Sequence, residues 1–297
     1  MENVEFRKGV IYALIAYSLW GIAPLYFKLI SQISAPEILM HRVIWSFALL
    51  FLLVIFTGQF NEVKLLLKKS KQLYVLFFTS LLVGTNWLIF IWAVNSDRLL
   101  EASLGYYINP LLNVALGMFF LKEKLPKLQL FAVGVATFGV LIQLIVYGSI
   151  PWVSLLLAGS FGIYGLMKKK VNLKAVTGLF VETAFLLPLA LIYWWQLDTD
   201  TANFSLNSLS LNFTLICAGI VTTLPLLAFS ASATRIPFYM LGLFQYIGPS
   251  AMFVMAITLF SEELDQTKLT TFIFIWLALI IFVYDLWRQA RKKRKAL

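Results

Sequence analysis

The sequence predicts an all-α membrane protein with ten transmembrane helices, on the basis of its composition and the length of its apolar segments. Of its 297 residues, 61% are hydrophobic and only 13% are charged, and the mean hydropathy is +0.86. A soluble globular protein has about 45–50% apolar and about 25% charged residues. Almost all of the chain is therefore expected to lie in the bilayer, which leaves no room for a sizeable soluble domain.

Ten apolar segments are long enough to cross a bilayer, since a spanning helix needs roughly 17–25 mostly apolar residues. The expected helices are 9–30, 36–57, 72–95, 100–121, 127–147, 150–167, 175–197, 211–233, 237–260 and 266–287. Prolines inside such helices remove backbone hydrogen bonds and are tolerated where neighbouring helices or a cavity satisfy the freed groups. We therefore expect helix breaks at four interior prolines: Pro24, Pro110, Pro225 and Pro249.

The lysine and arginine residues predict the orientation of the chain. If both termini are cytoplasmic, all but four of the 24 basic residues fall on the cytoplasmic side; the exceptions are Lys28, Arg42, Arg98 and Lys268. Such a positive-inside pattern favours cytoplasmic termini and an even number of spans. The basic residues 291–295 are interpreted as a cytoplasmic anchor near anionic lipid, and not as a nucleic-acid site.

One sequence pattern occurs twice, 139 residues apart. Residues 107–110 read Tyr-Ile-Asn-Pro and residues 246–249 read Tyr-Ile-Gly-Pro, and each is followed by a glutamate, Glu123 or Glu262. Apolar helices can match by chance, but the shared proline and glutamate spacing favours duplication. Five spans per half would invert the second copy in the membrane. We expect two inverted five-helix repeats around a central cavity, followed by a basic tail: 1–147, 148–287 and 288–297.

Six segments together have a distinctive sequence: AYSLWGIAPLYFKLI (16–30), PEILMHRVIWS (36–46), NWLIFIWAVN (86–95), LEASLGYYINPL (100–111), AGIVTTLPLL (218–227) and GLFQYIGP (242–249). With them, essentially the whole chain resembles the EamA family of the drug/metabolite transporter superfamily. The resemblance implies ten spans in two inverted repeats, a central cavity, alternating access and a location in the bacterial inner membrane. It does not specify a substrate, because members carry amino acids, nucleotide sugars or drugs.

Two charged residues are expected deep inside spans, Arg42 and Glu182, at equivalent positions of the two halves. A charge in lipid is costly and normally faces a cavity or a partner. Glu182 is interpreted as a proton or substrate-amine site, or as a structural carboxylate bonded to a neighbouring helix. Arg42 is interpreted as an anion anchor, or as a side chain that extends to the outer headgroups. A direct ion pair is not expected, because the inversion separates the two residues in depth.

Polar and aromatic residues of several spans are candidates for a substrate pathway. Tyr106, Asn109 and Asn113 share one helix face, and Gln245 lies on the equivalent face of span nine. Such amides can line a path or hydrogen-bond between helices. The expected pathway residues are Trp20, Arg42, Asn86, Trp92, Tyr106, Asn109, Asn113, Gln245 and Tyr246.

The leading functional hypothesis is a secondary transporter for a small organic metabolite or drug, either proton-coupled or facilitative. The sequence has no GxxxxGK[ST] phosphate loop for ATP hydrolysis, and no HExxH or GxSxG motif for intramembrane catalysis. One histidine and one cysteine do not suffice for a metal site, and no cofactor is expected. A non-transporting assembly or sensor protein is the alternative, and an intramembrane enzyme is less favoured. The expected partners are a small-molecule substrate and membrane lipid; the oligomeric state is left open.

Overall fold

The computed structural model describes residues 2–95, 98–259 and 266–295, and the secondary structure of these residues is helical. The elements in chain order are α1 (Glu2–Leu29), α2 (Ala35–Phe56), α3 (Phe60–Leu67), α4 (Ser70–Asn95), α5 (Leu99–Phe120), α6 (Lys127–Tyr147), α7 (Trp152–Val171), α8 (Ala175–Gln196), η1 (Asp200–Ala202), α9 (Leu209–Ala233), α10 (Phe238–Phe244), α11 (Ile247–Thr258) and α12 (Gln266–Lys295).

A helix is found at each of the ten predicted positions, and eight of the described segments are long and apolar enough to cross a membrane. The other two, α5 and α7, are 22 and 20 residues long, so length does not disqualify them. Polar residues interrupt the apolar sequence of both: α5 contains Asn109 and Asn113, and the last turn of α7 contains three lysines. The chain is a multi-pass membrane protein.

The prediction of helix breaks was wrong for three of the four prolines. Pro24, Pro110 and Pro225 lie inside helices that continue without interruption, α1, α5 and α9. A proline removes a single N–H donor, and in a packed bundle the helix resumes on its far side. Of these four prolines, Pro249 alone lies close to an interruption, the one between α10 and α11, where the Gly248 N–H donates to the Gln245 carbonyl oxygen three residues back (3.2 Å).

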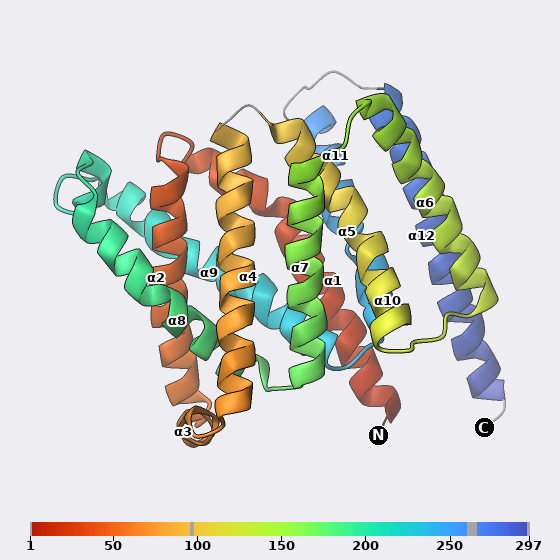
Figure 1. Ribbon diagram of the computed structural model, residues 1–297, viewed down its shortest axis with the longest axis horizontal. Helices are drawn as coiled ribbons and strands as arrows, with labels where there is room; N and C mark the ends of the chain where they lie inside the picture. The colour runs from red at the N-terminus through yellow and green to blue at the C-terminus, as the bar shows by residue number, and fades with distance from the viewer. Residues whose placement is uncertain (1, 96–97, 260–265, 296–297) are drawn as a thin grey trace.

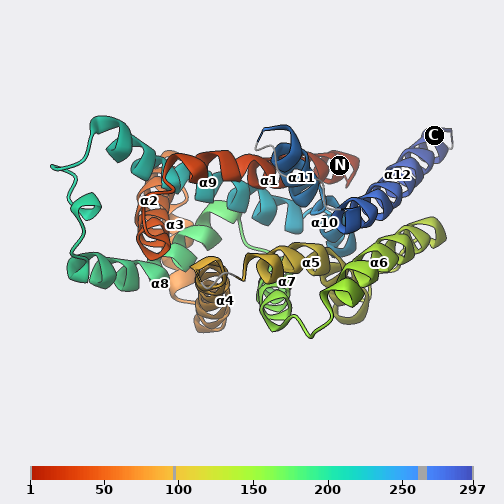
Figure 2. The ribbon, with the colours of Figure 1, turned by 90° about the horizontal axis from the view of Figure 1, so that it is seen from above.

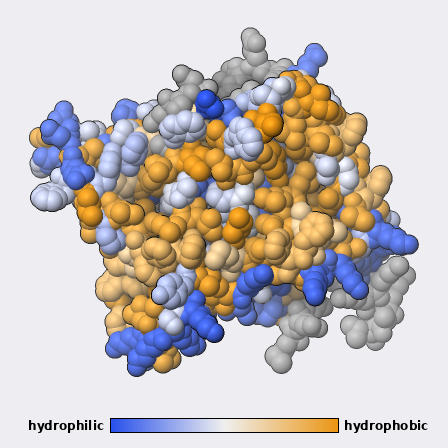
Figure 3. All heavy atoms as spheres, in the orientation of Figure 1, coloured by the Kyte–Doolittle hydropathy of each residue, from blue (hydrophilic) through white to orange (hydrophobic). Residues whose placement is uncertain are grey.

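The helices form two layers, which are seen edge-on in Figure 2. One layer contains α1, α9 and α11, and the other contains α4, α5 and α7; α6 and α12 pair at one end of the molecule. Figure 1 shows that α1 begins and α12 ends at the same edge. Hydrophobic residues cover the middle of the face in Figure 3, and hydrophilic residues gather along its lower edge. This distribution fits a molecule embedded in a bilayer.

The packing partners repeat in a regular way along the chain. Helix α1 packs against α9 and α11, and α7 packs against α4 and α5. Likewise α2 contacts α9, and α8 contacts α4. Helices α2 and α8, α5 and α10, and α6 and α12 also contact each other. Each layer thus combines helices from the first and the second half of the sequence, and the contacts that α1 and α2 make with α9 correspond to those that α7 and α8 make with α4.

The backbones of α2 and α9 approach each other closely at Gly219. A Cβ atom on Gly219 would lie 2.5 Å from the carbonyl carbon of Trp45, so only glycine fits this crossing. At the same point the Ser46 hydroxyl lies 3.4 Å from the Gly219 carbonyl oxygen that accepts its hydrogen bond. This contact fixes α9 against the part of α2 that carries Arg42.

Candidate substrate site

Arg42 lies where helices from the two ends of the sequence meet. It is on α2, and its Nε–H donates to the hydroxyl of Thr222 on α9 (2.9 Å). The guanidinium carbon lies 4.5 Å from the ring centroid of Trp87 on α4 and 5.7 Å from that of Phe27 on α1. Aromatic rings attract a cation through their negative faces. Four helices therefore surround this charge.

The positive charge of Arg42 has no carboxylate within 4 Å in the described part of the chain. A guanidinium has five N–H donors. Among the described residues, only its Nε–H group has a hydrogen-bond acceptor. Arg42 is partly exposed. Tyr106 is 38% exposed, and its ring centroid lies 6.1 Å from that of Phe90 on α4. The terminal N–H groups are thus open to a molecule that enters between the helices.

Glu182, by contrast, is neutralised by a lysine that the sequence interpretation had placed in a cytoplasmic loop. Lys168 Nζ lies 3.1 Å from Glu182 Oε2 and 3.2 Å from Oε1. The Thr79 hydroxyl donates to Oε1 (2.5 Å). Only 7% of the lysine and 2% of the glutamate side chain are exposed. Glu182 is thus bonded to its neighbouring helices α7 and α4 in this conformation.

The buried amides of α5 connect helices. Asn113 Nδ2 donates to Gln245 Oε1 (2.8 Å) and to Asn109 Oδ1 (3.1 Å). Asn109 Nδ2 in turn donates to the Ala158 carbonyl oxygen of α7 (2.6 Å). Asn109, Asn113 and Gln245 are each less than 9% exposed. Here the expected pathway amides act as interhelical hydrogen-bonding groups.

Two further pathway candidates also make interhelical bonds. Asn86 Nδ2 donates to the Leu157 carbonyl oxygen and to the Ser160 hydroxyl, both at 2.9 Å. The Tyr246 hydroxyl donates to the Tyr107 carbonyl oxygen (3.1 Å), and the Tyr246 side chain is fully buried. These contacts join α4 to α7 and the α10–α11 interruption to α5.

The two tryptophan candidates lie in different environments. Trp20 belongs to a buried aromatic cluster, with ring centroids 5.7 Å from Phe161 and 5.8 Å from Phe229. Trp92 is 49% exposed and stacks near Arg98, whose guanidinium carbon lies 5.4 Å from its ring centroid. Trp20 is therefore part of the interior between the layers, and Trp92 is on the periphery.

One end of the bundle is closed by a carboxylate that caps a helix of the opposite half. Glu123 follows α5, and its two oxygens accept the backbone N–H groups of Phe238 (2.8 Å) and Tyr239 (3.0 Å), at the start of α10. Lys169 Nζ lies 3.9 Å from the same carboxylate. Negative charge is favoured at a helix N-terminus. The expected counterpart, Glu262, is outside the described residues.

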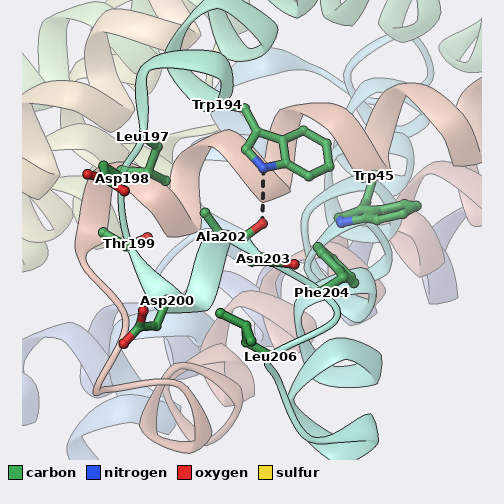
Figure 4. Close-up of a pocket in the computed structure, with 10 residues that line it drawn as sticks. All are labelled: Trp45, Trp194, Leu197, Asp198, Thr199, Asp200, Ala202, Asn203, Phe204 and Leu206. Carbon is green, nitrogen blue, oxygen red and sulfur yellow. Dashed lines mark hydrogen bonds between the residues drawn. The ribbon is translucent and has the colours of Figure 1, made fainter.

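A cavity of about 630 Å³ lies at the connection between α8 and α9, away from the predicted pathway residues. Figure 4 shows aromatic rings on one side and acidic or hydroxyl side chains on the other, with the Trp194 indole N–H donating to the Ala202 carbonyl oxygen. The principal residues around it are Trp45, Trp194, Phe204, Asp198, Thr199 and Asp200. The cavity is a widely open hollow at the edge of the bundle, and none of the predicted pathway residues lines it.

Four residues around the charged positions were missed from the sequence: Phe27 and Thr222 beside Arg42, and Lys168 and Thr79 beside Glu182. A signal for two of them was present. Positions 27 and 168 are 141 residues apart. Trp20 and Phe161, which occupy equivalent positions in the two halves of the sequence, have the same separation. Following the repeat through α1 and α7 would have brought both residues to the charged sites.

Comparison with known proteins identifies the family. Residues 7–145 match the model of the EamA-like transporter family. The chain is 52% identical to an uncharacterized transporter of Vibrio cholerae over 296 residues, which is 99% of this chain and 98% of the relative. It is 49% identical to protein RarD of Escherichia coli K12, covering 99% and 100%, and 31% identical to a chloramphenicol-sensitive protein RarD of Pseudomonas aeruginosa, covering 97% of each.

A solved crystal structure shares the fold, with a TM-score of 0.71 over 92% of this chain and 96% of that chain, although the sequences are only 13% identical. The relatives align from end to end, so the match is not confined to one half. The chain belongs to the EamA-like transporter family of the drug/metabolite transporter superfamily.

Proposed function

We propose that this protein is a secondary transporter that carries a small organic metabolite or drug across the bacterial inner membrane by alternating access. The observation that carries the proposal is Arg42, an ionised side chain held in the interior between α2 and the distant helix α9. A charge at such a place is costly unless it faces a pathway or a partner. Membership of a transporter family supports the same function.

The proposed architecture is two inverted five-helix repeats, residues 1–147 and 148–287, with both termini in the cytoplasm. It is supported by the exchange of packing partners between α1–α6 and α7–α12, which a pseudo-two-fold axis in the membrane plane would produce. The common edge at which α1 begins and α12 ends, and the basic residues near it, support the orientation.

In this scheme the end closed by Glu123 is the cytoplasmic gate. Gly9 of α1 touches the segment between α9 and α10 there: a Cβ on Gly9 would lie 2.6 Å from Ile236 Cγ2. The Ser232 hydroxyl also donates to the Gly9 carbonyl oxygen (2.8 Å). Opening toward the cytoplasm must separate these groups, because they join the first half to the second.

The gate offers a direct test. Cysteines replacing Gly9 and Ile236, in a Cys217→Ala background, would come within disulfide reach. Proteoliposomes are screened for saturable uptake and counterflow of small organic solutes. Oxidation is expected to stop uptake and a reductant to restore it, and each single-cysteine variant serves as the control. Uptake that continues after complete cross-linking would contradict alternating access, and the absence of any saturable flux would favour an assembly or sensor protein.

The energy source is tested at Glu182. Its pairing with Lys168 means that a coupling proton could load only if this ion pair opens. If Glu182 carries the proton, a variant with both Lys168→Met and Glu182→Gln loses uptake driven by a pH gradient but keeps exchange. A facilitative carrier shows no gradient-driven uptake even in the wild type.

A further inference from the structure

The two intramembrane charges occupy matching environments. Arg42 on α2 contacts Thr222 on α9 and Phe27 on α1. At the equivalent position of the other half, Glu182 on α8 contacts Thr79 on α4 and Lys168 on α7. The pairs 42 and 182, 27 and 168, and 79 and 222 are separated by 140, 141 and 143 residues, which is the spacing of the two halves.

The matching environments differ in their charge balance. In the second half, Lys168 supplies the cation that neutralises Glu182. In the first half the position equivalent to Lys168 is occupied by Phe27, whose ring attracts the cation but carries no net charge. Among the described residues, therefore, no negative charge near Arg42 balances its positive charge.

The surroundings of Arg42 define what could supply that charge. Its terminal N–H groups form a planar fork that matches a carboxylate in a bidentate arrangement. The Trp87 ring at 4.5 Å and the Phe27 ring at 5.7 Å place two apolar, flat surfaces next to the guanidinium. A monoanion balances the single charge, and a flat body packs against the rings.

We propose that the transported substrate is an aromatic or similarly planar monocarboxylate, whose carboxylate pairs with Arg42 beside Phe27 and Trp87. The inference rests on the proposed transport function, because it assigns the substrate class of that same site. The bound carboxylate forms an ion pair with Arg42 in the first half, as Glu182 already does with Lys168 in the second half, so that both charged sites are neutral. Empty, the site retains an uncompensated cation in the interior, and a bound carboxylate removes that cost.

Binding by purified protein in detergent tests the inference without requiring transport. Two series of probes keep the ring and change the charge: benzoate, benzamide and benzamidine, and indole-3-acetate, indole-3-acetamide and tryptamine. Calorimetry is expected to show that at least one anion binds about tenfold or more tightly than its neutral amide, because hydrogen bonds between charged groups are the stronger ones. Absence of such a preference in both series, including absence of binding, overturns the proposal.

Variants at two positions locate the effect. Arg42→Gln is expected to abolish the anion preference. Phe27→Glu places an internal carboxylate beside Arg42 and is expected to raise the melting temperature while weakening anion binding about tenfold or more. The matched control Phe27→Leu removes the ring without adding charge; it is expected to weaken binding of the anion and of its amide alike, so that the anion is still bound more tightly than the amide. The variant Lys174→Met, which removes an exposed cation elsewhere, is also expected to keep the anion preference.

The outcomes separate this inference from the proposed function. Saturable flux of neutral or cationic solutes that is unchanged in Arg42→Gln would leave a transporter and overturn the carboxylate. Selective anion binding without flux of any solute would keep the site and overturn transport. If Arg42→Gln does not fold, Phe27→Glu decides: unchanged anion binding in that variant overturns the assignment.

Discussion

Lys168 and Glu182 form a buried ion pair, with 3.1 Å between Nζ and Oε2, although the lysine comes from a run of basic residues at the end of α7. The two residues are 14 positions apart and the α7–α8 connection lies between them, so the pair joins two consecutive helices. Thr79 adds a third helix through its hydrogen bond to Oε1. The pair therefore holds α4, α7 and α8 together.

Breaking this pair on one side is expected to be strongly destabilising. Lys168→Met or Glu182→Met alone leaves an uncompensated buried charge, which costs about 3–5 kcal/mol. The double variant leaves no charge, so it should recover most of that loss. Unfolding of the purified protein in detergent, by heat or denaturant, measures the effect.

The exposed pair of Lys174 and Glu62 provides the control, since its side chains are 65% and 41% exposed. Surface pairs contribute about 0–1 kcal/mol, and Lys174→Met should therefore change stability little. Equal losses at the buried and exposed pairs would show that the Lys168–Glu182 contact is not an interior one.

Gly219→Ala is expected to separate α2 from α9. The added methyl group would meet the Trp45 backbone at 2.5 Å, and backbone cannot move aside as a flexible side chain can. We expect a loss of about 1–3 kcal/mol, typical of overpacking. Gly134→Ala in α6 is the matched control, because nothing lies within 4 Å of its added Cβ and alanine favours a helix. A Gly219→Ala variant as stable as Gly134→Ala would contradict the close crossing.

Most of the fold was predictable because the bilayer imposes strict requirements on length and polarity. Ten apolar segments predicted the positions of the helices, and the structure has a helix at each. The helix breaks were less predictable, since Pro24, Pro110 and Pro225 remove one donor each without ending the helix. The short helix α3 was not predicted; its eight residues are too few for a span and bury only Val63 and Leu66.

The site was only partly predictable, because hydropathy identifies a charge within a span but not its partner. Arg42 and Glu182 were recognisable for that reason. Lys168 was not, since a lysine beside Lys169 and Lys170 fits a cytoplasmic loop equally well, and only the packing of α7 on α4 turns it inward. The amide of Asn113 could have faced a path or a helix, and its partner Gln245 is 132 residues away.

Glu123→Ala is expected to loosen the start of α10. The substitution removes the acceptor of two backbone N–H groups, those of Phe238 and Tyr239, and the charge that favours this helix end. Losing such acceptors costs about 1–3 kcal/mol, which should speed amide exchange in residues 238–244 by about tenfold or more. Hydrogen exchange followed by mass spectrometry measures the exchange rate of these amides. Glu5→Ala, which removes an exposed carboxylate paired with Arg235 at the same end, should leave these amides protected.

The hydrogen bond between Asn113 and Gln245 is expected to contribute a measurable coupling between the two halves of the chain. In a double-mutant cycle, Asn113→Leu and Gln245→Leu each remove one partner, and the double variant removes both. Interhelical hydrogen bonds in membrane proteins average about 0.6 kcal/mol and reach about 1.7 kcal/mol, so the two losses should fall short of additivity by that amount. Asn86→Leu with Gln245→Leu is the control cycle: Asn86 bonds to α7 and shares no partner with Gln245, and its effects should add. If the proposed alternating access parts the two halves here, the Asn113→Leu and Gln245→Leu variants should also exchange solute faster than the wild type. Additive stabilities in the first cycle would mean that this bond does not hold the halves together.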